Sequence, residues 1–207
     1  MLTIALPKGR IADETLEIFS KIFNTNFAFD NRKLILEEHG FRFLNVRNQD
    51  VPTYVAHGAA DLGVVGLDVI TEQGLDIIDL LDMQLGRCRV AIGIKNNDEI
   101  DWNRPNIKVA TKMVNITKDY FAKKAVGVDV IKLYGSIELA PLVGLVDAIV
   151  DIVDTGATMK ENGLKVAEDI MHSSAHLISN NNSFYAKKSE IISIYEKIKS
   201  VIDDINN

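Results

Sequence analysis

Short apolar runs alternate with amphipathic stretches along the whole chain, and no other feature of the sequence constrains the fold as strongly. Apolar runs of this length are typical of buried strands, whereas the stretches between them have the apolar spacing of surface helices. Strands that alternate with helices favour an α/β architecture. Strands are expected at Leu2–Leu6, Phe41–Val46, Leu62–Gly66, Arg89–Ile94, Ile107–Ala110, Val128–Lys132 and Ala148–Val153.

The amphipathic stretches predict the helices. In the last of them, isoleucines and a valine recur at helical spacing, with lysines and acids between them. Helices are expected at Asp13–Phe23, Val51–Gly58, Leu67–Gln73, Ile116–Ala125, Thr158–Gly163 and Ser189–Asp204.

Two polar stretches, Lys95–Asn106 and Ser173–Ser183, resemble internal boundaries. If both mark domain edges, residues 95–178 form one lobe inserted into another lobe made of residues 1–94 and 179–207. The predicted fold therefore has two α/β lobes with a cleft between them, and small-molecule sites tend to lie in such clefts.

The composition excludes several classes of protein. A net charge of −6 argues against nucleic-acid binding, which needs a basic face. The single cysteine, Cys88, rules out an intrachain disulfide, and a free cysteine fits a reducing cytoplasm. The first residues lack the pattern of a signal peptide, and no apolar run approaches the ~20 residues of a membrane helix. We therefore expect a cytoplasmic chain that does not enter a membrane.

The segment from Asp147 to Met159 predicts a phosphate or phosphoribose site. An apolar run ends there in the small residues Asp154, Thr155, Gly156 and Ala157, and a helical pattern starts at Thr158. Unpaired backbone N–H groups at a helix start attract anions. Gly156 allows close approach of the backbone, and the threonine hydroxyls can donate to phosphate oxygens.

Acids beside this loop suit the hydroxyls of a ribose. Asp151 and Asp154 are three residues apart and would face opposite sides of a continuous strand. Both reach one ligand only if the strand ends near Val153, which we favour because the apolar pattern stops there. A purely structural interpretation also exists: Thr158 and Glu161 have the spacing of a capping box.

A second group of candidates is basic. Lys8, Gly9 and Arg10 follow the first predicted strand and precede a helix for which Asp13 is a plausible N-cap. Arg32 and Arg47 lie near the ends of other predicted elements. Arginine presents planar donors that suit phosphate, although an arginine taken alone is more often a solvated surface residue. His172 and His176 are four residues apart, but no third ligand accompanies them, so we predict no zinc site.

Several segments together resemble the ATP phosphoribosyltransferase family. They are ALPKGR at 5–10, RNQDVPTYV at 47–55, DLGVVGLDVI at 61–70, GRCRVAIGI at 86–94, VATKMVNITKDYF at 109–121 and LYGSIELAPLVGLVDAIVDIVDTGATMKENGL at 133–164. The resemblance runs from residue 1 to about residue 180, and the last segment is long and distinctive.

The resemblance implies a fold similar to type II periplasmic binding proteins. It also implies a reaction in which N1 of the adenine of ATP attacks C1 of phosphoribosyl pyrophosphate, assisted by Mg²⁺ held mainly by substrate phosphates. The loop at 154–158 would then cradle the 5′-phosphate, with Asp151 near the ribose hydroxyls. Arg10 and Arg32 would be catalytic, and Lys8, Gly9 and Arg47 would bind phosphates.

The resemblance also implies partners. The chain ends soon after its last predicted helix, without the extra C-terminal domain of the family's long form, and so looks like the short form. Short-form chains form homodimers that assemble with a regulatory subunit resembling histidyl-tRNA synthetase, as a hetero-octamer.

Three rival functions fit the sequence less well. A solute-binding protein of the same fold would normally need an export signal. An inactive assembly module is disfavoured because the cationic and loop positions are intact. A type I phosphoribosyltransferase is weaker, since its loop usually carries paired adjacent acids.

Overall fold

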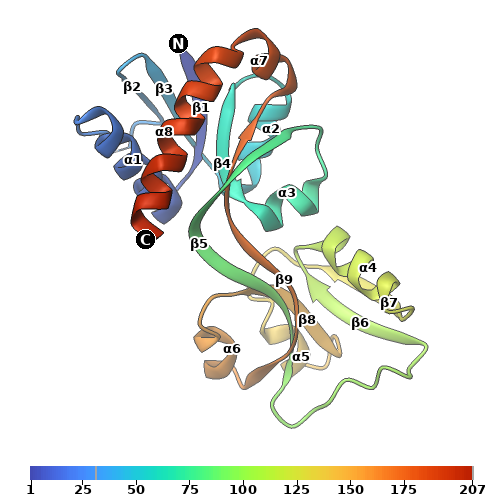
Figure 1. Ribbon diagram of the computed structural model, residues 1–207. Coiled ribbons are helices and arrows are strands. Elements are labelled where there is room, and N and C mark those ends of the chain that lie inside the picture. The colour runs from blue at the N-terminus through green and yellow to red at the C-terminus, as the bar shows by residue number, and fades with distance from the viewer. Residues whose placement is uncertain (31, 207) are drawn as a thin grey trace. The chain divides into compact units, whose positions relative to one another are not determined.

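The computed structural model describes residues 1–30 and 32–206, and it confirms the predicted α/β class. The chain divides into two compact units (Figure 1). Unit 1 comprises Met1–Gly86 and Ser174–Asn207, and unit 2 comprises Arg87–Ser173.

Unit 1 is a sheet with helices on both faces. Its strands run in the order β2-β3-β1-β4-β9, where β9 is Leu164–Ser179. Strand β1 is parallel to both β3 and β4, whereas β2 is antiparallel to β3 and β9 is antiparallel to β4. The elements are β1 (Leu2–Pro7), α1 (Arg10–Phe23), β2 (Ile35–Glu38), β3 (Phe41–Val46), a 3₁₀ turn (Asn48–Asp50), α2 (Val51–Ala56), β4 (Leu62–Gly66), α3 (Leu67–Gln73), α7 (Asn181–Ala186) and α8 (Lys188–Asn206).

Alternation along the strands explains why both faces are covered. In β1, Ile4 packs in a core with α1 and α8, whereas Ala5 packs on the opposite face with α2. Successive side chains of a strand point to opposite faces, so a strand that is apolar throughout needs helices on both sides. None of the helices in the described residues has the length and apolar character of a membrane span.

Unit 2 repeats this architecture on a smaller scale. Its strands run in the order β5-β8-β6-β7, where β5 is Ile78–Lys95, and β8 is parallel to β6 and antiparallel to β5. The elements are β6 (Asn106–Thr111), α4 (Val114–Lys123), β7 (Gly127–Lys132), α5 (Leu139–Leu142), β8 (Ala148–Val153) and α6 (Ala157–Glu161).

Two long strands, β5 (Ile78–Lys95) and β9 (Leu164–Ser179), contribute residues to both units. The division therefore lies within these strands, whereas the sequence prediction placed the edges at residues 94 and 178. The predicted boundary at 173–183 begins at the observed division between Ser173 and Ser174, and its residues form the end of β9 and the first half of α7. The other predicted boundary, the polar stretch 95–106, lies inside unit 2. Exposed residues alternate with half-buried ones in the first half of β9, which therefore lacks the continuous apolar run that predicts a buried strand.

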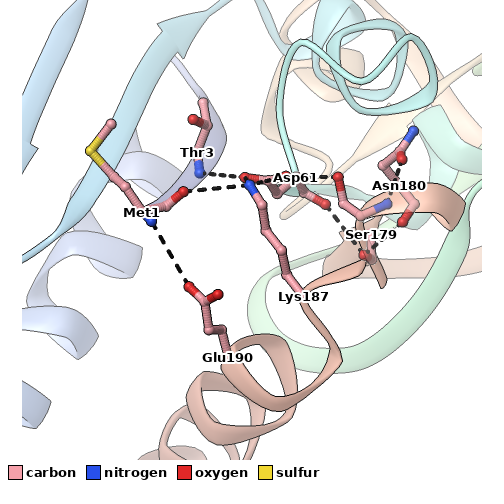
Figure 2. Close-up of polar contacts among 8 residues, drawn as sticks. Met1, Thr3, Asp61, Ser179, Asn180, Lys187 and Glu190 are labelled. Carbon is pink, nitrogen blue, oxygen red and sulfur yellow. Dashed lines mark hydrogen bonds and ion pairs between the residues drawn. The ribbon is translucent and has the colours of Figure 1, made fainter. Parts of the chain in front are cut away.

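A buried carboxylate connects the sheet of unit 1 to its C-terminal helices (Figure 2). Asp61, just before β4, accepts hydrogen bonds from the backbone N–H of Thr3 (2.9 Å) and the Ser183 hydroxyl (2.7 Å). Lys187 places its Nζ 2.8 Å from Oδ2 and 2.9 Å from Oδ1 of Asp61. Burial alone would raise the pKa of the Asp61 carboxyl, but these bonds outweigh it and hold the pKa below its ordinary value.

Replacing Lys187 tests this contact. Lys187→Ala leaves a buried carboxylate without its cation, and we expect the free energy of unfolding at neutral pH to fall by about 2 kcal/mol. The Asp61 pKa is lower in the folded than in the unfolded chain, so its stabilisation is present above the unfolded pKa of 3.8 and is lost as pH falls below it. The difference between wild type and variant should therefore shrink in acid, as measured by urea unfolding.

Lys188→Ala is the matched control, since Lys188 is the exposed next residue. Equal losses in the two variants, or a difference that grows in acid, would contradict the role given to Lys187.

Candidate active site

The loop after β8 borders a small pocket within unit 2. As predicted, β8 ends at Val153, and Asp154 lies in the bend that follows. Asp151 and Asp154 therefore line the same pocket, although they would face opposite sides of a continuous strand. The pocket has a volume of about 80 Å³ and is lined by Glu138, Asp151, Ile152, Val153, Asp154, Thr155, Gly156, Ala157, Thr158 and Met159.

Gly156 gives the loop its shape. Its φ of 82° lies in the left-handed region, which glycine adopts without the strain of a Cβ atom. The Thr155 hydroxyl accepts a hydrogen bond of 3.3 Å from the N–H of Ala157. Thr158 is exposed, so its hydroxyl is accessible to a ligand.

The capping-box interpretation of this loop is wrong. Helix α6 begins at Ala157 with Gly156 as its N-cap, and no side chain caps it. Thr158 lies inside the helix, where its carbonyl accepts from the backbone and side-chain amides of Asn162. The small residues 155–157 turn the chain one residue earlier than the pattern predicted.

The Asp151 carboxylate is anchored on one side. Its Oδ1 accepts from the N–H of Ile152 (2.8 Å) and lies 3.3 Å from Nζ of Lys112. Side-chain exposure is 19% for Asp151 and 30% for Lys112, so the pair is only partly screened by water. Within the described chain, no residue donates to the other oxygen, Oδ2, which is left to accept from a ligand.

The basic candidates gather at one edge of the unit 1 sheet. Strands β1 and β3 are parallel and pair Pro7 with Val46, so Lys8 and Arg47 follow neighbouring carboxyl ends. The N–H of Lys8 donates to the carbonyl of Val46 (2.9 Å), which holds the two chain ends together. All of Lys8, Gly9, Arg10 and Arg47 are exposed.

Arg32 reaches this edge by a different route. It lies in a turn shortly before β2, and the first residue of β2, Ile35, pairs with Leu44 near the carboxyl end of β3. Antiparallel pairing thus brings the turn of Arg32 to the edge that carries Arg47.

Helix α1 begins earlier than predicted. Its first residue is Arg10, with Gly9 at φ 104° as the N-cap, so the expectation that Asp13 caps the helix is wrong. Arg10 is extensively exposed, and its Nε lies 3.6 Å from Oε1 of Glu14. Such an exposed pair contributes little stability, and the guanidinium can leave it for a phosphate at small cost.

The structure therefore forms two groups of candidates. Lys8, Gly9, Arg10, Arg32 and Arg47 lie in unit 1, and Asp151 with 154–158 lies in unit 2.

Sequence reasoning missed two neighbours of the second group. Glu138 lines the pocket from the turn before α5, and Lys112 contacts Asp151 from the end of β6. Glu138 falls in the distinctive SIELAP segment, which could have drawn attention to it, but no local pattern distinguishes Lys112.

Among the described residues, no three His, Cys, Asp or Glu side chains are placed to bind one metal ion together. His176 instead lies between two acids, with Nδ1 2.9 Å from Asp79 and Nε2 3.9 Å from Asp82.

Comparisons with known proteins agree on one family. The family described as HisG, ATP phosphoribosyltransferase, matches residues 47–200. An ATP phosphoribosyltransferase of Sulfurovum sp. is 78% identical over 203 residues, covering 98% of each chain. That of Sulfurimonas denitrificans is 69% identical and covers 98% of this chain and 97% of its own.

Solved structures extend the comparison. A structure described as the ATP phosphoribosyl transferase (HisG:HisZ) complex from Thermotoga maritima has a TM-score of 0.86 and 33% identity, over 99% of this chain and 100% of that one. The periplasmic aliphatic sulphonate binding protein SsuA of Escherichia coli has a TM-score of 0.63 at 14% identity, over 97% and 72%. This second likeness shows the fold alone and confirms the predicted resemblance to periplasmic binding proteins.

Gly156 provides a test of the loop geometry. Gly156→Ala forces a Cβ into the left-handed region, although no atom lies closer than 3.8 Å, so we expect a loss of about 1 kcal/mol from backbone strain alone. Gly135→Ala is the control in the same unit, because Gly135 has no positive φ and open space around its Cβ position. Comparable urea midpoints for the two variants would contradict the left-handed loop.

Proposed function

The chain belongs to the ATP phosphoribosyltransferase family, and from this we propose that it transfers the phosphoribosyl group of phosphoribosyl pyrophosphate to N1 of the adenine of ATP. The products are phosphoribosyl-ATP and pyrophosphate, in the first step of histidine biosynthesis. The observation that carries the proposal is 78% identity to a named family member across 98% of both chains.

The loop after β8 is the proposed binding site for the phosphoribosyl group. Backbone N–H groups and the Thr155 and Thr158 hydroxyls would donate to the 5′-phosphate, and Gly156 would let the backbone approach it. Asp151 and Asp154 would accept hydrogen bonds from the ribose hydroxyls, because carboxylates act only as acceptors when ionised. A pocket that combines donors with acceptors suits a ligand carrying both phosphate and hydroxyl groups.

The chemistry needs no protein nucleophile. The lone pair of adenine N1 forms the new bond to C1 of the ribose while the bond from C1 to pyrophosphate breaks with inversion, and the electron pair leaves with pyrophosphate. Catalysis then depends on positioning two anionic substrates and stabilising the departing charge. We assign this stabilisation to Arg10 and Arg32, and the binding of substrate phosphates to Lys8, Gly9 and Arg47.

Mg²⁺ is the proposed cofactor. Substrate phosphates would supply most of its ligands, and the exposed Asp154 carboxylate is a hard oxygen donor that Mg²⁺ accepts beside such phosphates, so the residues present fit the ion. Bound Mg²⁺ would neutralise part of the pyrophosphate charge.

We also propose the partners of the family's short form. The chain would form a homodimer that assembles with a regulatory subunit resembling histidyl-tRNA synthetase into a hetero-octamer in the cytoplasm. Two observations support this: the Thermotoga maritima structure is described as a HisG:HisZ complex, and this chain covers all of its matched chain.

The direct test follows product formation by its ultraviolet absorbance, with ATP, phosphoribosyl pyrophosphate, Mg²⁺ and a pyrophosphatase. We expect a rise that requires both substrates and that histidine does not suppress unless the regulatory subunit is present. No rise with either the chain alone or the reconstituted complex would overturn the proposed function.

Arg32 gives the sharpest test of a single role. Arg32→Ala should lower kcat about 100-fold, the typical cost of removing one preorganised donor to developing charge. Lys33→Ala is the matched control, because the adjacent, exposed Lys33 pairs with Asp30 at 2.8 Å. Unchanged turnover in the Arg32 variant, with an unaltered circular dichroism spectrum, would remove Arg32 from the mechanism.

A further inference from the structure

The pocket beside the β8 loop has an unbalanced charge. Glu138, Asp151 and Asp154 line it, and its lining contains no lysine, arginine or histidine. Phosphoribosyl pyrophosphate is itself strongly anionic, so three carboxylates would oppose its binding unless a cation of the protein offsets them in addition to the proposed Mg²⁺ on the pyrophosphate. Carboxylates suit the ribose hydroxyls, but the phosphates need positive charge close by.

Lys112 is the cation that the structure places against this pocket. It follows the last residue of β6, and β6 pairs with β8 so that Thr111 lies opposite Val150. The Lys112 Nζ lies 3.3 Å from Oδ1 of Asp151, which directly follows Val150. The pair thus spans the carboxyl ends of two neighbouring parallel strands.

The backbone around Lys112 is held firmly. The buried Thr111 hydroxyl donates to the carbonyl of Val150 (2.7 Å) and accepts from the N–H of Met113 (2.8 Å). These bonds fix the residues on both sides of Lys112 relative to β8. The backbone of Lys112 is therefore held in place, and the conformation of its side chain determines the contact with Asp151.

Other cations of unit 2 form ion pairs with acids that do not line this pocket. Arg89 pairs with Asp169, Arg104 with Asp147, and Lys124 with Glu168. Among the residues that the structure describes, Lys112 is the only cation recorded in an ion pair with an acid of the pocket.

We propose that Lys112 is a positioning residue for phosphoribosyl pyrophosphate, an inference that rests on the proposed function. By occupying Oδ1, Lys112 and the Ile152 N–H orient the Asp151 carboxylate so that Oδ2 accepts from a ribose hydroxyl. Its charge also offsets the acids of the pocket, so that a polyanion can bind beside them. Both effects concern phosphoribosyl pyrophosphate and leave the binding of ATP unaffected.

Steady-state kinetics separate this role from a structural one. Lys112→Gln removes the charge, and we expect the KM for phosphoribosyl pyrophosphate to rise about tenfold, the effect of losing one hydrogen bond to a charged group. The KM for ATP should stay within about twofold. Lys112→Arg keeps the charge and should restore most of the lost affinity. Lys118→Gln is the matched control, since Lys118 is an exposed lysine of α4 in the same unit.

A double-mutant cycle tests whether Lys112 acts through Asp151. In an Asp151→Asn background, Lys112→Gln should raise the KM for phosphoribosyl pyrophosphate by clearly less than in the wild type, because the two effects are coupled. Full additivity would overturn the positioning role, as would equal rises in both KM values or no rise at all. If Lys112→Gln fails to fold, Lys112→Met keeps the aliphatic stem and takes its place.

The proposed function can fail independently. If the wild type forms no phosphoribosyl-ATP, alone or with the regulatory subunit, that function is overturned. Calorimetric titration with phosphoribosyl pyrophosphate then decides the inference: a dissociation constant about tenfold weaker in Lys112→Gln than in wild type supports it, and equal constants refute it.

Discussion

The position of β8 between two neighbouring strands determines the geometry of the loop at 154–158 that follows it. It pairs with β5 on one side and β6 on the other, and its last residue, Val153, lies opposite Arg89. A strand hydrogen-bonded on both edges cannot slip in register without exposing its apolar side chains. The point at which β8 ends therefore brings Asp151 and Asp154 to the same pocket, and the register with β6 brings Lys112 to Asp151.

Local charge matters more than global charge in this molecule. The chain carries a net charge of −6, yet exposed cations gather at the carboxyl edge of the unit 1 sheet. Parallel strands make such clustering possible, because residues far apart in sequence follow neighbouring strand ends. The proposed anion binding therefore depends on strand order, which net charge does not reveal.

Much of the fold was predictable from the sequence, because buried strands form continuous apolar runs. The bounds of β3, β4, β8 and α3 agree with the prediction, since their apolar runs end sharply at polar or small residues. The strands that were missed, β2 and β9, carry exposed or alternating side chains, and pairing with neighbours decides their position. The same reason separates the site residues: Asp151 and Asp154 stand in a recognisable segment, whereas the significance of Lys112 arises only from the register of β6 against β8.

The contact between Asp61 and Lys187 affects how the chain can fold during its own synthesis. Residues 1–86 leave the ribosome first, but β9 pairs with β4, and α8 supplies buried isoleucines to their core. Until the last segment emerges, Asp61 lacks its cation and the apolar face of β1 is incompletely covered. Domains generally fold as they are synthesised, so all residues of unit 2 are available for folding before residues 174–207 complete unit 1. Residues 1–86 therefore gain the last of their core contacts only after unit 2 has been synthesised.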